Sequence, residues 1–110
     1  MMRRRTALTA ALAAPFINAY ATQGKVRLGL SLPLTGVQAS VAAELLAGYD
    51  LAWADAASLG VEVQAEVEDD RSKPDLTAAA VRKFARDASI VAATGLVGTP
   101  HAQAAVPVAR

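Results

Sequence analysis

Two hydrophobic periods alternate along residues 25–109, and this alternation limits the fold more than any other feature of the chain. Residues 25–32 (KVRLGLSL) place apolar side chains at every second position, which predicts a β-strand. Residues 40–57 place them three and four positions apart, which predicts a helix. The same two patterns continue downstream and predict a strand over 61–67, a helix over 74–87, a strand over 90–94 and the start of a further helix within 102–109.

Strands that alternate with helices predict an α/β fold, with a parallel sheet and helices on both faces. The charged and apolar alternation of residues 61–67 (VEVQAEV) indicates a half-exposed strand near a sheet edge, whereas the apolar run 90–94 (IVAAT) indicates a buried strand. Ligands of parallel sheets bind at the carboxyl ends of the strands. The expected ligand-binding segments are therefore 32–40, 68–73 and 95–101.

The first 21 residues have the three parts of an export signal. Arg3, Arg4 and Arg5 precede an apolar run over 6–17, and Ala19-Tyr20-Ala21 follows as an A-x-A cleavage site. The run is shorter than the roughly 20 residues that span a bilayer. We expect cleavage after Ala21 and a periplasmic mature chain. Arg4-Arg5 also fits a twin-arginine signal, and the alternative is an amphipathic N-terminal helix of a cytoplasmic protein.

Charge and composition disfavour several classes of function. Residues 22–110 hold 8 Lys+Arg and 10 Asp+Glu, a net charge of −2, so no basic surface is expected for nucleic acid. The chain has no cysteine and one histidine, which disfavours thiolate and histidine metal sites. Nucleotide-binding glycine motifs and the nucleophile elbow of hydrolases are missing too. We therefore expect no cofactor, no metal and no catalytic residue.

Several residues have both a functional and a structural interpretation. Asp69 and Asp70 could bind a cation or transfer protons, but a solvated strand end or a capping turn is the favoured interpretation. His101 could be a general base, although a surface or pocket-wall position is favoured. Tyr49 and Trp53 are expected to pack in the core. Gly48, inside a helix, suggests a close approach to a strand.

The segment 95–100 (GLVGTP) is the most informative loop. It leaves a strand, carries two glycines and a hydroxyl, and precedes a possible helix. Such a loop can offer free backbone N–H groups to a carboxylate. A plain turn between strand and helix explains the same residues equally well.

The ordered motifs of residues 22–110 resemble the type I periplasmic solute-binding family, in particular its branched-chain amino-acid (Leu/Ile/Val) binding group. Residues 26–36 are similar to the family's first strand and its P-L-[ST]-G turn, and Gly48 is similar to the family's helix glycine. Residues 67–70 are similar to its second strand and D-D turn, residues 91–95 to its third strand, and residues 98–100 to a G-T-P loop. Pro74, Ala78–Ala80, Ala104-Ala105 and Pro107 also match the family's pattern.

The resemblance implies the first lobe of a two-lobed fold that closes over a small ligand and delivers it to a membrane permease of an ABC importer. It implies ligand contacts at Val97, Gly98 and Thr99, with the Thr99 hydroxyl on a carboxylate, and a cleft-facing position for Ser40 and Val41. Many family members carry an aromatic residue where Val41 lies. The family also runs well beyond position 110, so residues 22–110 are expected to form only the N-terminal part of lobe 1.

Two other functions remain open at this point. A ligand-sensing domain of the same fold would serve a receptor or regulator instead of a permease, and the chain could also be a non-functional fragment. A small exported enzyme would require Asp69, Asp70 and His101 to meet within hydrogen-bonding reach of one pocket.

Overall fold

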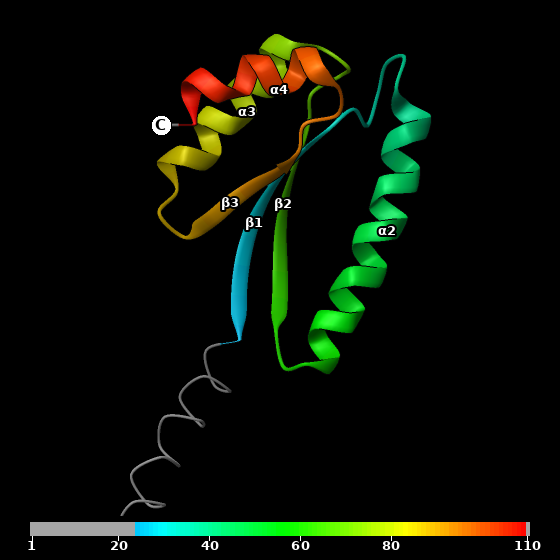
Figure 1. The fold of residues 1–110 in the computed structure, drawn as a ribbon, viewed down its shortest axis with the longest axis vertical. Helices are drawn as coiled ribbons and strands as arrows, with labels where there is room; N and C mark the ends of the chain where they lie inside the picture. Colours follow the sequence, from blue (N-terminus) through cyan, green and yellow to red (C-terminus); the bar gives the residue numbers. More distant parts are fainter. Residues whose placement is uncertain (1–23, 110) are drawn as a thin grey trace, which may run out of the picture.

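A computed structural model describes residues 24–109 of the chain. The elements are β1 Lys25–Leu32, α2 Ala39–Ser58, β2 Glu62–Asp69, α3 Pro74–Arg86, β3 Ile90–Gly95, α4 Thr99–Ala105 and a short 3-10 helix, η1, over Val106–Val108 (Figure 1). Both predicted periods are therefore confirmed, with element ends displaced by only a few residues. The largest displacement is at α4, which begins at Thr99 and not at Ala102, so Thr99 and Pro100 belong to the helix.

The three strands form one parallel sheet in the order β2-β1-β3. β1 pairs along its whole length with β2, from Lys25 opposite Glu62 to Leu32 opposite Asp69. The α/β class and the edge position of the second strand are confirmed. Because the strands are parallel, their carboxyl ends lie together at one end of the sheet, beside the loops that lead into α2, α3 and α4 (Figure 1). We call this end of the sheet its carboxyl edge, as distinct from the outer strands β2 and β3.

The alternation of β1 assigns its side chains to two different helical layers. Leu30 and Leu32 are fully buried and pack with Ala42 of α2, and partly buried Tyr49 and Trp53 of the same helix join this cluster. The rings of Tyr49 and Trp53 are stacked with centroids 5.6 Å apart, as core packing predicts. The opposite face of β1 meets α3, where the buried Phe84 ring lies against Gly29.

The expected close approach at Gly48 is wrong. A Cβ atom built on Gly48 would meet nothing within 4 Å, and the residue is exposed on α2. This helix contacts the sheet along one narrow side, and Ala42 is its fully buried residue. Gly48 lies on the other side, where no strand approaches it.

The expectation that residues 90–94 form a buried strand is also wrong. Val91 is 69% exposed, and Ala92 and Ala93 are exposed beside it. β3 is the outer strand of the described sheet, with β1 on one side and no strand on the other within residues 24–109. An apolar sequence therefore lies at an open edge of the sheet.

Pro107 explains the end of the last helix. It has no backbone N–H and its ring disfavours a continuing α-helix, and the chain tightens here from α4 into η1. In the described part of the chain, no helix is both long and apolar enough to cross a membrane. The expected export signal at residues 1–21 lies outside the described residues.

Candidate functional site

The carboxyl edge of the sheet brings together the three segments that sequence reasoning selected. The loop after β1 contains Gln38, the loop after β2 begins at Asp70, and the loop after β3 runs from Leu96 to Gly98. Direct hydrogen bonds join these loops to each other and to the strands. For example, the backbone N–H of Gln38 donates to Ser72 Oγ at 3.1 Å, and that of Leu96 donates to the carbonyl of Ser31 at 3.1 Å.

The five residues expected at the ligand differ in their surroundings. Val97 is partly buried and packs against the core beneath α2, whereas Gly98 and Thr99 are exposed. Ser40 and Val41 lie in the first turn of α2 and are exposed as well. Val97 therefore anchors the loop, and the other four present polar or apolar groups to the outside.

The loop after β3 has an unusual backbone. Gly95 and Gly98 both have φ of 98°, and Leu96 between them has φ of 46°. A left-handed conformation costs a residue such as leucine about 1 kcal/mol. The loop turns outward here, and the N–H groups of Gly98 and Thr99 make no backbone hydrogen bond within residues 24–109. Within the described residues, these two N–H groups are available as hydrogen-bond donors.

Gln38 belongs to the site, although sequence reasoning did not select it. Its Nε2 lies 3.9 Å from the position that a Cβ on Gly98 would take. Its Oε1 is buried and has no hydrogen-bond partner within the described chain. An unsatisfied buried carbonyl oxygen costs about 1–3 kcal/mol. A polar side chain in the last loop position before a helix, at the carboxyl end of a strand, is the signal that could have identified it.

Asp70 is fully buried, so the favoured interpretation of a solvated strand end is wrong for this residue. Its Oδ2 accepts from Ser31 Oγ at 3.0 Å and from Thr77 Oγ1 at 3.1 Å, and its Oδ1 accepts from the backbone N–H of Ser72 at 3.0 Å. One carboxylate thus connects β1, the loop after β2 and α3. These hydrogen bonds replace the ones that a buried polar group loses when water is excluded.

His101 is buried too, with 5% of its surface exposed, so the expectation of a surface side chain is wrong. Its Nδ1 lies 2.6 Å from Thr77 Oγ1 and 3.7 Å from Asp70 Oδ2. The cause is the packing of α4 against α3, which covers the ring. We call Ser31, Asp70, Thr77 and His101 the Asp70 cluster.

Asp69 points away from the Asp70 cluster. It accepts from the backbone N–H and hydroxyl of Thr35, at 3.2 and 2.7 Å, and from the backbone N–H of Arg71 at 2.9 Å. The Thr35 hydroxyl lowers the pKa of Asp69 below its usual value, with the backbone N–H of Arg71 contributing in the same direction. Since Asp69 and His101 do not share a site, the three residues of the enzyme hypothesis do not converge.

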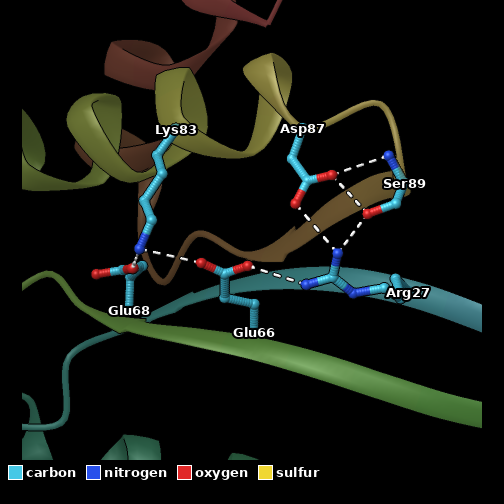
Figure 2. Close-up of polar contacts among 6 residues, drawn as sticks. All are labelled: Arg27, Glu66, Glu68, Lys83, Asp87 and Ser89. Atoms are coloured by element: carbon cyan, nitrogen blue, oxygen red, sulfur yellow. Dashed lines mark hydrogen bonds and ion pairs between the residues drawn. The ribbon is translucent and has the colours of Figure 1, made fainter.

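A separate group of charges lies on the α3 face of the sheet (Figure 2). Arg27 on β1 contacts Glu66 at 3.3 Å and Asp87 at 3.1 Å, while Lys83 of α3 contacts Glu66 at 3.0 Å and also Glu68. The hydrogen bonds that Lys83 donates to Glu68 and then to Glu66 raise the pKa of Lys83. This partly exposed ion network joins α3 to β1 and β2. We interpret it as structural, because it connects elements of the fold.

No three His, Cys, Asp or Glu side chains within residues 24–109 are grouped so that they could hold a metal ion. The chemistry that the carboxyl edge offers consists of free N–H groups, the exposed hydroxyls of Ser40 and Thr99, and the carboxamide of Gln38. Such groups can form hydrogen bonds with a small polar molecule.

The family comparison agrees with this description. Residues 25–110 match the model of a family described as periplasmic binding protein. No match was found among curated proteins or among solved structures. Proteins of the matching family have a solute-binding role and are typically non-enzymatic, and the family implies a periplasmic location. From this match over most of its length, and from its α/β lobe, we conclude that the chain belongs to the periplasmic binding protein family.

Proposed function

We propose that this protein is the substrate-binding component of an ABC importer and binds a small carboxylate-bearing solute, such as a branched-chain or related amino acid. The observation that carries the proposal is the loop at Gly98 and Thr99. It offers two N–H groups that make no backbone hydrogen bond within residues 24–109 and an exposed hydroxyl, at the sheet edge where parallel folds bind ligands. Hydrogen bonds from such donors to a carboxylate are charge-assisted and stronger than neutral ones.

In this proposal the ligand carboxylate accepts from the Thr99 hydroxyl and from the N–H groups of Gly98 and Thr99. Ser40 and Val41, exposed on the first turn of α2, line the neighbouring side of the cleft. Val97 supports the loop from the core. Residues 22–110 would form the N-terminal part of the first lobe of a two-lobed binding protein, with a membrane permease as its partner.

Replacing the hydroxyl tests the proposal directly. Thr99→Ala should weaken the binding of a carboxylate ligand roughly tenfold or more, because a hydrogen bond to a charged group contributes about 1.5–3 kcal/mol. Isothermal calorimetry against a panel of L-α-amino acids that includes leucine, isoleucine and valine measures this loss.

Thr99→Ser is the matched control, because it keeps the hydroxyl and removes only a methyl group. It should bind with nearly unchanged affinity. If Thr99→Ala binds every ligand of the panel as tightly as the unmodified protein does, Thr99 does not belong to the site.

Export is the second part of the proposal. The basic, apolar and A-x-A parts of residues 1–21 support an export signal that is cleaved after Ala21. Sequencing the N-terminus of protein recovered from the periplasm should find Thr22 first. A chain that keeps Met1 and stays in the cytoplasm would argue against export.

A further inference from the structure

The loop after β3 is attached to the rest of the fold at both of its ends. At its start, the backbone N–H of Leu96 donates to the carbonyl of Ser31, a fully buried residue of β1, at 3.1 Å. At its end, the loop continues into the first turn of α4, where the backbone N–H of Ala102 donates to the carbonyl of Gly98 at 3.1 Å. His101, in the same turn, is buried. The donors of the loop therefore lie between two attachments.

Both attachments lead to one oxygen atom of the Asp70 carboxylate. Ser31 Oγ donates to Asp70 Oδ2 at 3.0 Å, so Asp70 holds the residue that holds the start of the loop. The Thr77 hydroxyl donates to the same oxygen at 3.1 Å and lies 2.6 Å from Nδ1 of His101. Asp70 Oδ2 is thus connected to the start of the loop through Ser31 and to its end through Thr77.

The other oxygen of Asp70 is connected to the loop after β1. Asp70 Oδ1 accepts from the backbone N–H of Ser72 at 3.0 Å. The hydroxyl of Ser72 accepts from the backbone N–H of Gln38 at 3.1 Å and donates to the carbonyl of Thr35 at 3.0 Å. One buried carboxylate therefore joins all three loops of the carboxyl edge.

Backbone strain is concentrated in two of these loops. Among residues 24–109, the non-glycine residues with positive φ are Arg71, Ser72 and Leu96, at 53°, 61° and 46°. Such conformations persist only where the surrounding structure holds them. The N–H of Ser72 is held by Asp70, and that of Leu96 by Ser31. Weaker attachments should therefore let the loop after β3 adopt other conformations.

We propose that Ser31, Asp70 and Thr77 are positioning residues of the ligand site, which hold residues 96–99 in their binding geometry before a ligand arrives. This inference rests on the proposed function. All three side chains are fully buried, so they act through the loop and not by contact with the ligand. A loop that is already ordered loses less conformational freedom on binding, which makes the ligand bind more tightly.

Hydrogen exchange of the full chain without ligand tests whether the loop is held. Thr77→Val keeps the shape of the side chain and removes the hydroxyl that lies between Asp70 and His101. It should speed the exchange of the Ala102 amide about fivefold or more relative to amides within β1, because the first turn of α4 opens locally. Thr77→Ser keeps the hydroxyl and should restore slow exchange.

Ser31→Ala tests the other end of the loop in the same way. It removes the hydrogen bond to Asp70 and leaves the Ser31 carbonyl in place. The Leu96 amide should then exchange faster relative to amides within β1, and the Ala102 amide should change less. This variant also carries the test if Thr77→Val does not fold.

Calorimetry with the panel of L-α-amino acids that includes leucine, isoleucine and valine tests the effect on binding. Thr77→Val and Ser31→Ala should each bind about fivefold more weakly, and Thr77→Ser nearly as tightly as the unmodified protein. Val81→Ala is the control for a general loss of stability, because Val81 is buried on α3 outside the Asp70 cluster. It should lower the urea midpoint and leave binding unchanged.

The remaining outcomes separate this inference from the proposed function. If neither variant speeds exchange at its end of the loop, the Asp70 cluster does not hold the loop, and the inference is wrong. It is also wrong if both variants bind as tightly as the unmodified protein, or if Val81→Ala weakens binding to the same extent. If the unmodified protein binds no L-α-amino acid, the proposed function itself is wrong, whatever the exchange rates are.

Discussion

Gly29 and Gly48 are both glycines inside regular elements, and their surroundings differ completely. A Cβ on Gly29 would overlap the ring of Phe84, which is 2% exposed and seals the α3 face of β1. A Cβ on Gly48 would point into open space. The same residue type therefore permits a close contact in one place and only weakens a helix in the other.

Alanine at each position should change stability in opposite directions. Gly29→Ala should destabilise the protein by about 1–3 kcal/mol, because the Phe84 ring must move from a packed position. Gly48→Ala should stabilise it by about 1 kcal/mol, because alanine is the better helix former and meets no obstacle. Urea denaturation measures both. Equal effects of the two substitutions would contradict the contact at Phe84.

At the scale of elements, the attachment of α3 to the sheet depends on charge as well as on packing. Arg27 reaches Asp87 at the end of α3, and Lys83 reaches two glutamates of β2. The hydroxyl and backbone N–H of Ser89 lower the pKa of Asp87, and Arg27 adds to this effect. A carboxyl group whose pKa is lower in the folded state than in the unfolded state stabilises the protein at pH values above the unfolded-state pKa. This stabilisation is lost as the pH falls through the folded-state pKa.

Asp87→Asn should therefore lower the stability of the protein at neutral pH but not in strong acid. The loss of stability should be greatest above pH 3.8, the ordinary pKa of an aspartate side chain. It should disappear as the pH falls through the lower pKa that Asp87 has in the folded protein. Urea midpoints at a series of pH values measure the difference. Asp50→Asn, on the exposed side of α2, removes the same charge away from the network and should show no such loss. A pH-independent loss for Asp87→Asn would contradict the argument.

At the scale of the whole molecule, the two outer strands have different edges. β2 carries four acidic residues, Glu62, Glu66, Glu68 and Asp69, whereas the sequence of β3 (IVAATG) holds no charge. Open apolar strands tend to pair with other chains, and charged side chains oppose this pairing. β3 is therefore the part of the described sheet most prone to self-association.

A lysine on β3 should reduce self-association at high protein concentration. Val91→Lys places a charge at the 69% exposed position of this strand. Val37→Lys is the control, because Val37 is 94% exposed but lies in the loop before α2. Light scattering over a concentration series should show fewer oligomers for Val91→Lys alone. The same decrease for both variants would mean that net charge, and not the edge, is responsible.

Much of this molecule could be predicted from local patterns. The period of two in residues 25–32 and the helical spacing of 40–57 each describe how a segment presents one face, and this information is contained in the segment itself. The parallel sheet follows from the order of elements, and with it the edge at which the loops of Gln38, Asp70 and Gly98 gather.

The neighbours of each side chain were decided only by the tertiary structure. Asp70 and His101 look like surface residues in the sequence, yet α3 and α4 cover both of them, and Thr77, 24 positions away from His101, joins them. The apolar strand over Ile90–Gly95 looks buried in the sequence, yet three of its residues, Val91, Ala92 and Ala93, are exposed. A pattern shows that a face is apolar or polar, but burial depends on which distant segment packs against it, and only the folded chain brings those segments together.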